Sequence, residues 1–110
     1  MKWLTIHVGG QKWGVYLVNP GNKRLLDEDE QVFGITYPEA CRIYLARGQS
    51  EQALEDSLLH ELLHAALRVS GAGHDIGDEV KEERIVRDLT PVLHRLLKDL
   101  GFRFPKGSAA

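Results

Sequence analysis

The sequence predicts an α+β fold in which a small antiparallel sheet of about three strands packs on two helices. The N-terminal half alternates apolar and polar residues with the period of strands, whereas the C-terminal half carries two long segments with helical apolar spacing. Glycine-containing turn signals separate the segments, and there are no internal repeats. A chain of 110 residues is short enough to form one domain, predicted over 1–105, with a disordered tail at 106–110.

Three segments of the first half are expected to form strands. Lys2 to Val8 and Trp13 to Val18 alternate apolar and polar side chains, and a Gly-Gly pair between them favours a hairpin. Cys41 to Ala46 alternates in the same way and is predicted as the third strand. Val32 to Tyr37 is compatible with a short strand or an irregular crossing, because Pro38 interrupts it.

Two helices are expected in the second half. The first begins after Ser50, a residue type that caps helix N-termini, and ends at Gly71. The glycine-rich stretch that follows, through Gly77, is predicted as a loop. The second helix is predicted from about Asp78 to Leu100, and Pro91 inside it favours a kink or a break. Its apolar stripe is expected to pack against the first helix. The stripe consists of Ile85, Val86, Leu89, Val92 or Leu93, Leu96, Leu97 and Leu100.

Composition and charge exclude several classes of function. A formal net charge of -2 gives no basic field, so nucleic acid is not an expected partner. No apolar stretch is long enough to span a bilayer, and the N-terminus lacks the pattern of a signal peptide, so no membrane partner is expected. The single Cys41 is expected to be a small buried residue in a reducing compartment. These observations predict a cytoplasmic protein; no oligomeric state follows from them.

The most specific pattern is the HExxH sequence His60-Glu61-Leu62-Leu63-His64. Residues four apart share a helix face, so His60 and His64 can direct two imidazoles at one metal ion. Glu61 lies beside them, where it can act as a base on a metal-bound water. Zinc-dependent hydrolysis requires this combination of two nitrogen ligands, a base and an open coordination position.

Two histidines four residues apart also arise by chance or on a solvated helix face. The residues around the motif argue against both explanations, because apolar side chains surround it on nearly all sides of the helix. Histidine and glutamate inside so apolar a helix are costly to bury without partners, which a metal ion supplies. One zinc ion per chain is therefore predicted. The flanking residues are Leu58, Leu59, Leu62, Leu63, Ala65, Ala66 and Leu67.

A catalytic zinc site usually has three protein ligands, and HExxH supplies two of them. His74, in the glycine-rich loop, offers a third nitrogen. Glu82 and Glu83 lie at the start of the second helix, which is expected to pack against the first. Helix geometry alone favours Glu82, in the middle of the apolar stripe, over Glu83 near its edge. All three residues remain candidates on these grounds.

The stretch from Arg42 to Asp99 resembles a minimal zincin metallopeptidase of the gluzincin kind, and is similar to the small HExxH metallopeptidases common in bacteriophage and prophage genomes. The likeness lies in the strand Arg42-Ile43-Tyr44-Leu45, in HELLH and in the second helix. In such families a glutamate on the second helix is the third zinc ligand, three residues before a small or apolar residue. The resemblance therefore implies Glu83, with Val86 at the third place. Arg87 departs from the asparagine that larger relatives carry next.

The predicted function is zinc-dependent hydrolysis of peptide bonds in a peptide or protein substrate. His60, His64 and Glu83 are the predicted metal ligands, and Glu61 is the predicted general base. The strand from Cys41 to Ala46 is expected to bind an extended substrate along a free edge. Candidates for stabilising the oxyanion, each more simply explained as structural, are Tyr37, Tyr44, His74 and His94.

Two other interpretations remain open. The chain could be a non-catalytic or latent zinc-stabilised accessory module of a phage or prophage that binds a partner protein. In that case the metal would act as a folding staple, and a fourth protein ligand such as His74 would close the site. Hydrolysis of an amide other than a peptide bond is the third possibility.

Overall fold

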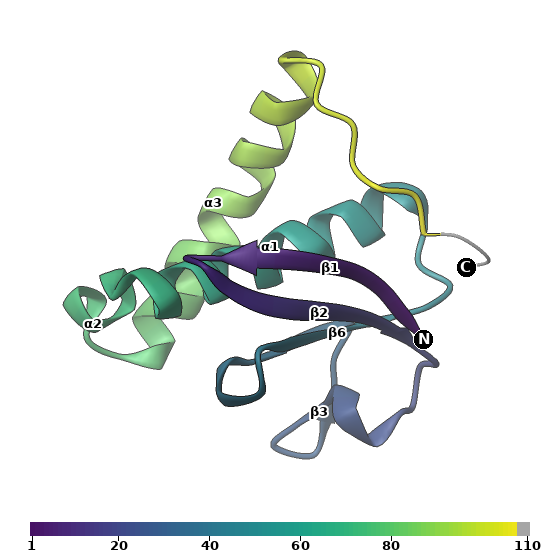
Figure 1. Cartoon of the computed structure of the whole chain (residues 1–110), viewed down its shortest axis with the longest axis horizontal. Coiled ribbons are helices and arrows are strands. Elements are labelled where there is room, and N and C mark those ends of the chain that lie inside the picture. The colour runs from purple at the N-terminus through teal and green to yellow at the C-terminus, as the bar shows by residue number, and fades with distance from the viewer. Residues whose placement is uncertain (108–110) are drawn as a thin grey trace.

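The computed structural model describes residues 1–107, and in this range the fold is α+β, as predicted. A four-stranded sheet lies on one side of α1, and α3 crosses α1 and extends away from the sheet (Figure 1). A separate hairpin is formed by β3 (Leu26–Asp27) and β4 (Glu30–Gln31). The strands of the main sheet are β1 (Lys2–Val8), β2 (Gln11–Val18), β5 (Gly34–Tyr37) and β6 (Arg42–Ala46).

The main sheet is mixed, and has one strand more than the three that were expected. Its order is β1-β2-β6-β5: β2 and β6 run parallel, and the other two pairs are antiparallel. The prediction of a purely antiparallel sheet was wrong because the chain turns back after β2, through a short 3-10 helix (Lys23–Leu25) and the β3–β4 hairpin. β5 then runs opposite to β2, so β6 returns in the direction of β2.

The sheet order also corrects the predicted substrate edge. The strand from Arg42 to Ala46 has β2 on one side and β5 on the other, so neither of its edges is free. β5 pairs with this strand and is itself the last strand of the sheet, with Tyr37 opposite Arg42 and Ile35 opposite Tyr44. The short segment that the sequence left undecided between strand and irregular crossing is therefore the edge strand.

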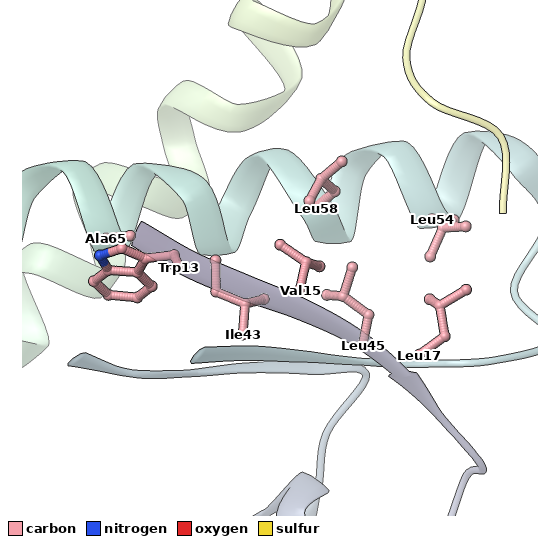
Figure 2. Packing of buried hydrophobic residues seen from close by; sticks show 8 residues of the cluster. All are labelled: Trp13, Val15, Leu17, Ile43, Leu45, Leu54, Leu58 and Ala65. Carbon is pink, nitrogen blue, oxygen red and sulfur yellow. The ribbon is translucent and has the colours of Figure 1, made fainter. Parts of the chain in front are cut away.

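The hydrophobic core fixes α1 (Glu51–Ser70) on the sheet. Alternate residues of β2 and β6 point to the same face, where leucines and an alanine of α1 cover them (Figure 2). On the opposite face Tyr16 stacks on Tyr44 with 5.2 Å between ring centroids, and Leu25 is fully buried beside them. The core between sheet and helix consists of Trp13, Val15, Leu17, Ile43, Leu45, Leu54, Leu58 and Ala65.

The helix ends follow the capping signals in the sequence. The Ser50 hydroxyl accepts a hydrogen bond from the backbone N–H of Ala53, and Gly71 ends α1 with a φ of 82°. The predicted loop that follows contains one short helix, α2 (Ala72–Ile76), so that part of the prediction was wrong. The side chain of Asp78 caps α3 (Glu79–Asp99), which continues through Pro91 as one helix.

The orientation of α3 differs from the predicted one. Ile85, Leu89, Val92 and Leu96 are 38–55% exposed, whereas Val86 is 1% exposed and packs inward. The helix is rotated because Glu82 and His94 on its inner face bind α1, and these contacts decide which part of the broad apolar face is covered. The buried polar residues of α3 are Glu82, Thr90 and His94.

The chain beyond α3 folds back along the sheet. Phe104 packs against the core cluster and lies against the His94 ring, with 5.3 Å between centroids. The Trp3 indole N–H donates a hydrogen bond to the Lys106 carbonyl oxygen, so the first part of the predicted tail contacts β1. Residues 108–110 of that predicted tail lie outside the described residues. Cys41 is half-buried at the core margin rather than fully buried.

Within residues 1–107, no helix has both the length and the apolar composition that a membrane crossing requires.

A buried polar contact holds α3 across α1. The imidazole Nε2 of His94 lies 2.8 Å from Glu55 Oε1, and both residues are less than 10% exposed. The ammonium of Lys98 lies 2.9 Å from the same oxygen of Glu55. Burial works to raise the pKa of Glu55, but the hydrogen bonds from His94 and Lys98 outweigh it and hold the pKa below its ordinary value. The contact therefore stabilises the fold most when Glu55 is ionised.

Replacing Glu55 with Gln is expected to lower the free energy of unfolding by about 2 kcal/mol at pH 7, the scale of a hydrogen bond to a charged group. Because the folded-state pKa of Glu55 lies below the unfolded one, its contribution is present above the unfolded pKa. It is lost as the pH falls through the folded pKa. Urea unfolding at a series of pH values measures this. The difference between parent and variant should shrink below pH 4.5, the ordinary pKa of the group; a difference that stays constant would contradict the assignment.

Candidate metal centre

Two imidazoles and one carboxylate converge between α1 and α3. His60 and His64 lie one turn apart on α1, with 5.1 Å between ring centroids. The two carboxylate oxygens of Glu83 lie 2.8 Å from His60 Nε2 and 2.6 Å from His64 Nε2. One ligand atom from each of the three residues lies within 4.8 Å of the others, and no further group of this kind occurs in residues 1–107. The structure thus brings together the three residues predicted to hold the metal.

The donor set suits zinc. Imidazole nitrogen and carboxylate oxygen bind Zn²⁺ at about 2.0–2.2 Å, which separates neighbouring ligand atoms by roughly 3.4 Å in a tetrahedral site. The present separations between the Glu83 oxygens and the two Nε2 atoms fall short of this by under about 1 Å. His60 is 22% exposed and Glu83 is 49% exposed, so the ligand atoms are accessible. The Glu83 oxygens and the two Nε2 atoms would therefore need to separate by less than about 1 Å to admit an ion.

Glu82 and Glu83 have different positions, which separates the two carboxylates that the sequence offered. Glu82 is 5% exposed, because it lies on the inner face of α3 with Val86 rather than on the exposed part of the apolar stripe. Its oxygens contact His64 Nδ1 at 2.6 Å and Arg68 Nε at 3.3 Å, rather than the nitrogen atoms that face Glu83. A carboxylate on the second ring nitrogen fixes the orientation of a metal-binding histidine and raises its basicity.

The protonation of His64 follows from these contacts. Burial works to lower the pKa of His64, but the hydrogen bonds to Glu82 and Glu83 and the charge of Glu61 outweigh it and raise the pKa. His74, the third candidate ligand from the sequence, does not join the site. It lies exposed on α2, outside the group of converging ligand atoms. A closed site with His74 as a fourth ligand is therefore not formed in the described structure.

Glu61 lies in the wall between α1 and β5. Its side chain is 7% exposed, and burial raises the pKa of this carboxyl although a hydrogen bond from Thr36 opposes the shift. The Thr36 hydroxyl lies 2.8 Å from Glu61 Oε1 and 3.2 Å from the Glu61 backbone oxygen. Threonine 36 was not singled out in the sequence, because only the pairing of β5 with β6 reveals which residue of that strand reaches α1.

Gly34 allows β5 to approach Glu61 closely. A Cβ at this position would lie 3.2 Å from Glu61 Oε2 and 2.9 Å from a methyl carbon of Leu45. Both distances are shorter than ordinary van der Waals contact, so a side chain here would displace the carboxylate or the strand. The glycine and the threonine together hold Glu61 beside the histidines.

The group opens into a cleft of about 740 Å³ between β5, α1 and α3. Glu61, His60, His64 and Glu83 all line it, together with residues 32–36. The basic side chains of Arg68 and Arg87 also reach this cleft, and neither was assigned a role from the sequence. A cavity of this size, with polar groups converging on one point, is typical of a small-molecule or peptide site.

The residues considered as oxyanion stabilisers lie elsewhere. The Tyr44 hydroxyl accepts hydrogen bonds from Arg24 and Arg42, and the Tyr37 hydroxyl donates to the Arg24 carbonyl oxygen. His94 is bound to Glu55, as described above. Neither these three side chains nor His74 lines the cleft, which fits the structural explanation for each.

Comparisons with protein-family models, with curated proteins and with solved structures gave no match to this chain. The resemblance to minimal zincins stays a prediction.

Proposed function

We propose that this protein is a zinc-dependent peptidase whose centre is formed by His60, His64 and Glu83. The observation that carries the proposal is the convergence of their three ligand atoms within 4.8 Å at the surface of a cleft, next to the buried carboxylate of Glu61. A structural zinc site is usually closed by four protein ligands, whereas three ligands facing a cleft leave a position for water or substrate.

The roles of the residues follow from their positions. A bound zinc ion would polarise a substrate carbonyl and lower the pKa of water. Glu61, the residue that follows the ligand His60, accepts the proton of the attacking water and returns it to the leaving amine. Thr36 and Gly34 keep that carboxylate beside the histidines. Glu82 orients His64 through its Nδ1 atom.

The free edge of β5 favours a peptide over other amides as substrate. β5 pairs with β6 on one side only, and residues 32–36 line the cleft. An extended peptide can add to such an edge through backbone hydrogen bonds, and alternate side chains then meet the cleft walls. Phe33, 70% exposed at the cleft rim, offers an aromatic surface to one of these substrate side chains.

The proposal is tested by incubating the zinc-loaded protein with a library of peptides derived from a cell extract. New peptide termini, identified by mass spectrometry, are expected at a restricted set of sequences. Dialysis against a chelator should stop cleavage, and added zinc should restore it. If the protein binds zinc stoichiometrically but cleaves no member of the library, the accessory-module interpretation replaces this one.

A further inference from the structure

The outer face of α3 carries an uncovered apolar stripe. Ile85, Leu89, Val92 and Leu96 are all exposed and follow one another at spacings of four, three and four residues. This spacing is the seam of a two-helix coiled coil, in which each apolar side chain inserts between residues of the facing helix. Contiguous exposed apolar residues on a soluble domain usually mark an interaction surface.

The stripe is separate from the metal centre. At 100° per residue, Glu83, Arg87 and Thr90 point to one side of α3, and the stripe lies roughly 150° away round the helix. Val86 lies between the two, and His94 lies on the same side of the helix as Glu83 and Thr90; both are buried. A partner on the stripe would therefore leave the cleft open.

The stripe is complementary to itself in an antiparallel arrangement. When Leu89 of one chain lies opposite Val92 of a second copy, the same register places Ile85 opposite Leu96. A two-fold axis repeats both contacts, as in an isologous dimer. These contacts use all four residues of the stripe, so the first residue of the stripe in one chain lies opposite the last residue in the other.

The charged residues beside the stripe fit the same register. Asp88 and Arg95 lie on the solvent-facing flank of the stripe, and both are exposed. In the antiparallel register Asp88 of each chain lies on the same flank as Arg95 of the other, about 3 Å along the helix axis from direct opposition. This offset is within reach of the long Arg95 side chain, so two ion pairs form across the axis. Arg95 already contacts Asp99 on its own helix at 3.0 Å, which orients the guanidinium along this flank.

We propose that α3 is a homodimerisation helix, in which Ile85, Leu89, Val92 and Leu96 pack antiparallel against the same residues of a second copy. The pairing of Asp88 with Arg95 sets the register. This inference does not depend on the proposed peptidase activity, because no residue of the stripe lines the cleft.

Sedimentation velocity of the full chain over a wide concentration range tests the proposal. The parent is expected to dimerise, and Val92→Asp is expected to be monomeric. Val80→Asp is a matched control, because Val80 is an exposed valine on α3 outside the stripe; it should dimerise like the parent. A parent that stays monomeric at all concentrations, or a Val92→Asp variant that dimerises equally well, would overturn the proposal.

Charge exchange tests the register. Asp88→Arg alone and Arg95→Asp alone each place like charges opposite one another, and each should raise the dissociation constant by about tenfold or more. The double variant Asp88→Arg/Arg95→Asp should recover most of the affinity, and a mixture of the two single variants should form a heterodimer. Single variants that dimerise as tightly as the parent, or a mixture that remains monomeric, would refute the antiparallel pairing.

Discussion

Replacing Glu61 with Gln is expected to slow peptide hydrolysis by on the order of 10³-fold while the zinc content stays unchanged. Glutamine has the shape of glutamate and can keep the hydrogen bond from Thr36, but its amide is not basic enough to take a proton from water. Initial rates on a peptide identified in the library experiment, together with zinc analysis of the same samples, measure both quantities.

Glu79→Gln is the control for this variant, because Glu79 also lines the cleft but is 91% exposed and touches none of the converging ligand atoms in the described structure. Its rate should stay close to that of the parent.

A second comparison uses Thr36: replacement by Val removes the hydroxyl that holds Glu61, whereas Ser retains it. A Glu61→Gln variant that cleaved as fast as the parent would rule out the assigned role.

The second large effect concerns the metal. Replacing both His60 and His64 with Ala should abolish zinc binding, since only the carboxylate of Glu83 would remain. The single variants on α3 should differ: Glu83→Ala removes a ligand, whereas Glu82→Ala removes an orienting contact and should weaken zinc binding by about 10–100-fold. Competition with a chromophoric chelator gives the dissociation constants.

His74→Ala serves as the control in this series, because His74 lies outside the converging group and should bind zinc like the parent. Stoichiometric zinc in the double histidine variant would disprove the site. A larger loss for Glu82→Ala than for Glu83→Ala would exchange the roles of the two carboxylates.

The local signals in the sequence predicted the helices well. Ser50, Gly71 and Asp78 act through hydrogen bonds or dihedral angles within a few residues, so the ends of α1 and the start of α3 could be located from sequence. The direction of β6 could not, because alternation is the same in parallel and antiparallel strands. The path of the chain between β2 and β6 decides that direction.

In the candidate site, too, local features could be predicted from the sequence and features that depend on tertiary packing could not. The spacing of His60 and His64 is a property of one helix, and it predicted their convergence. The choice between Glu82 and Glu83 depends on the rotation of α3, which the buried pair of His94 with Glu55 helps to fix from three turns away. The apolar pattern alone centred the helix wrongly, because periodicity measures how apolar a face is and carries no information on polar partners. Thr36 and Gly34 lie beside Glu61 only because β5 pairs with β6, so their proximity could not be predicted from sequence spacing.

The parallel pairing of β2 with β6 has a consequence for any attempt to shorten the chain. All residues of the candidate centre lie between Gly34 and Glu83, and the helix that carries Glu83 ends at Asp99. Yet β6, which positions α1, has β2 as its neighbour along its full length. Trp13, Val15 and Leu17 of β2 are three of the five core residues that the sheet places beneath that helix. A fragment cut to begin at Gly34 would lack these three side chains and expose the core face of α1, with Ile43 and Leu45, to water. The first eighteen residues contribute no atom to the centre, but they are part of the smallest piece of this chain that can fold around it.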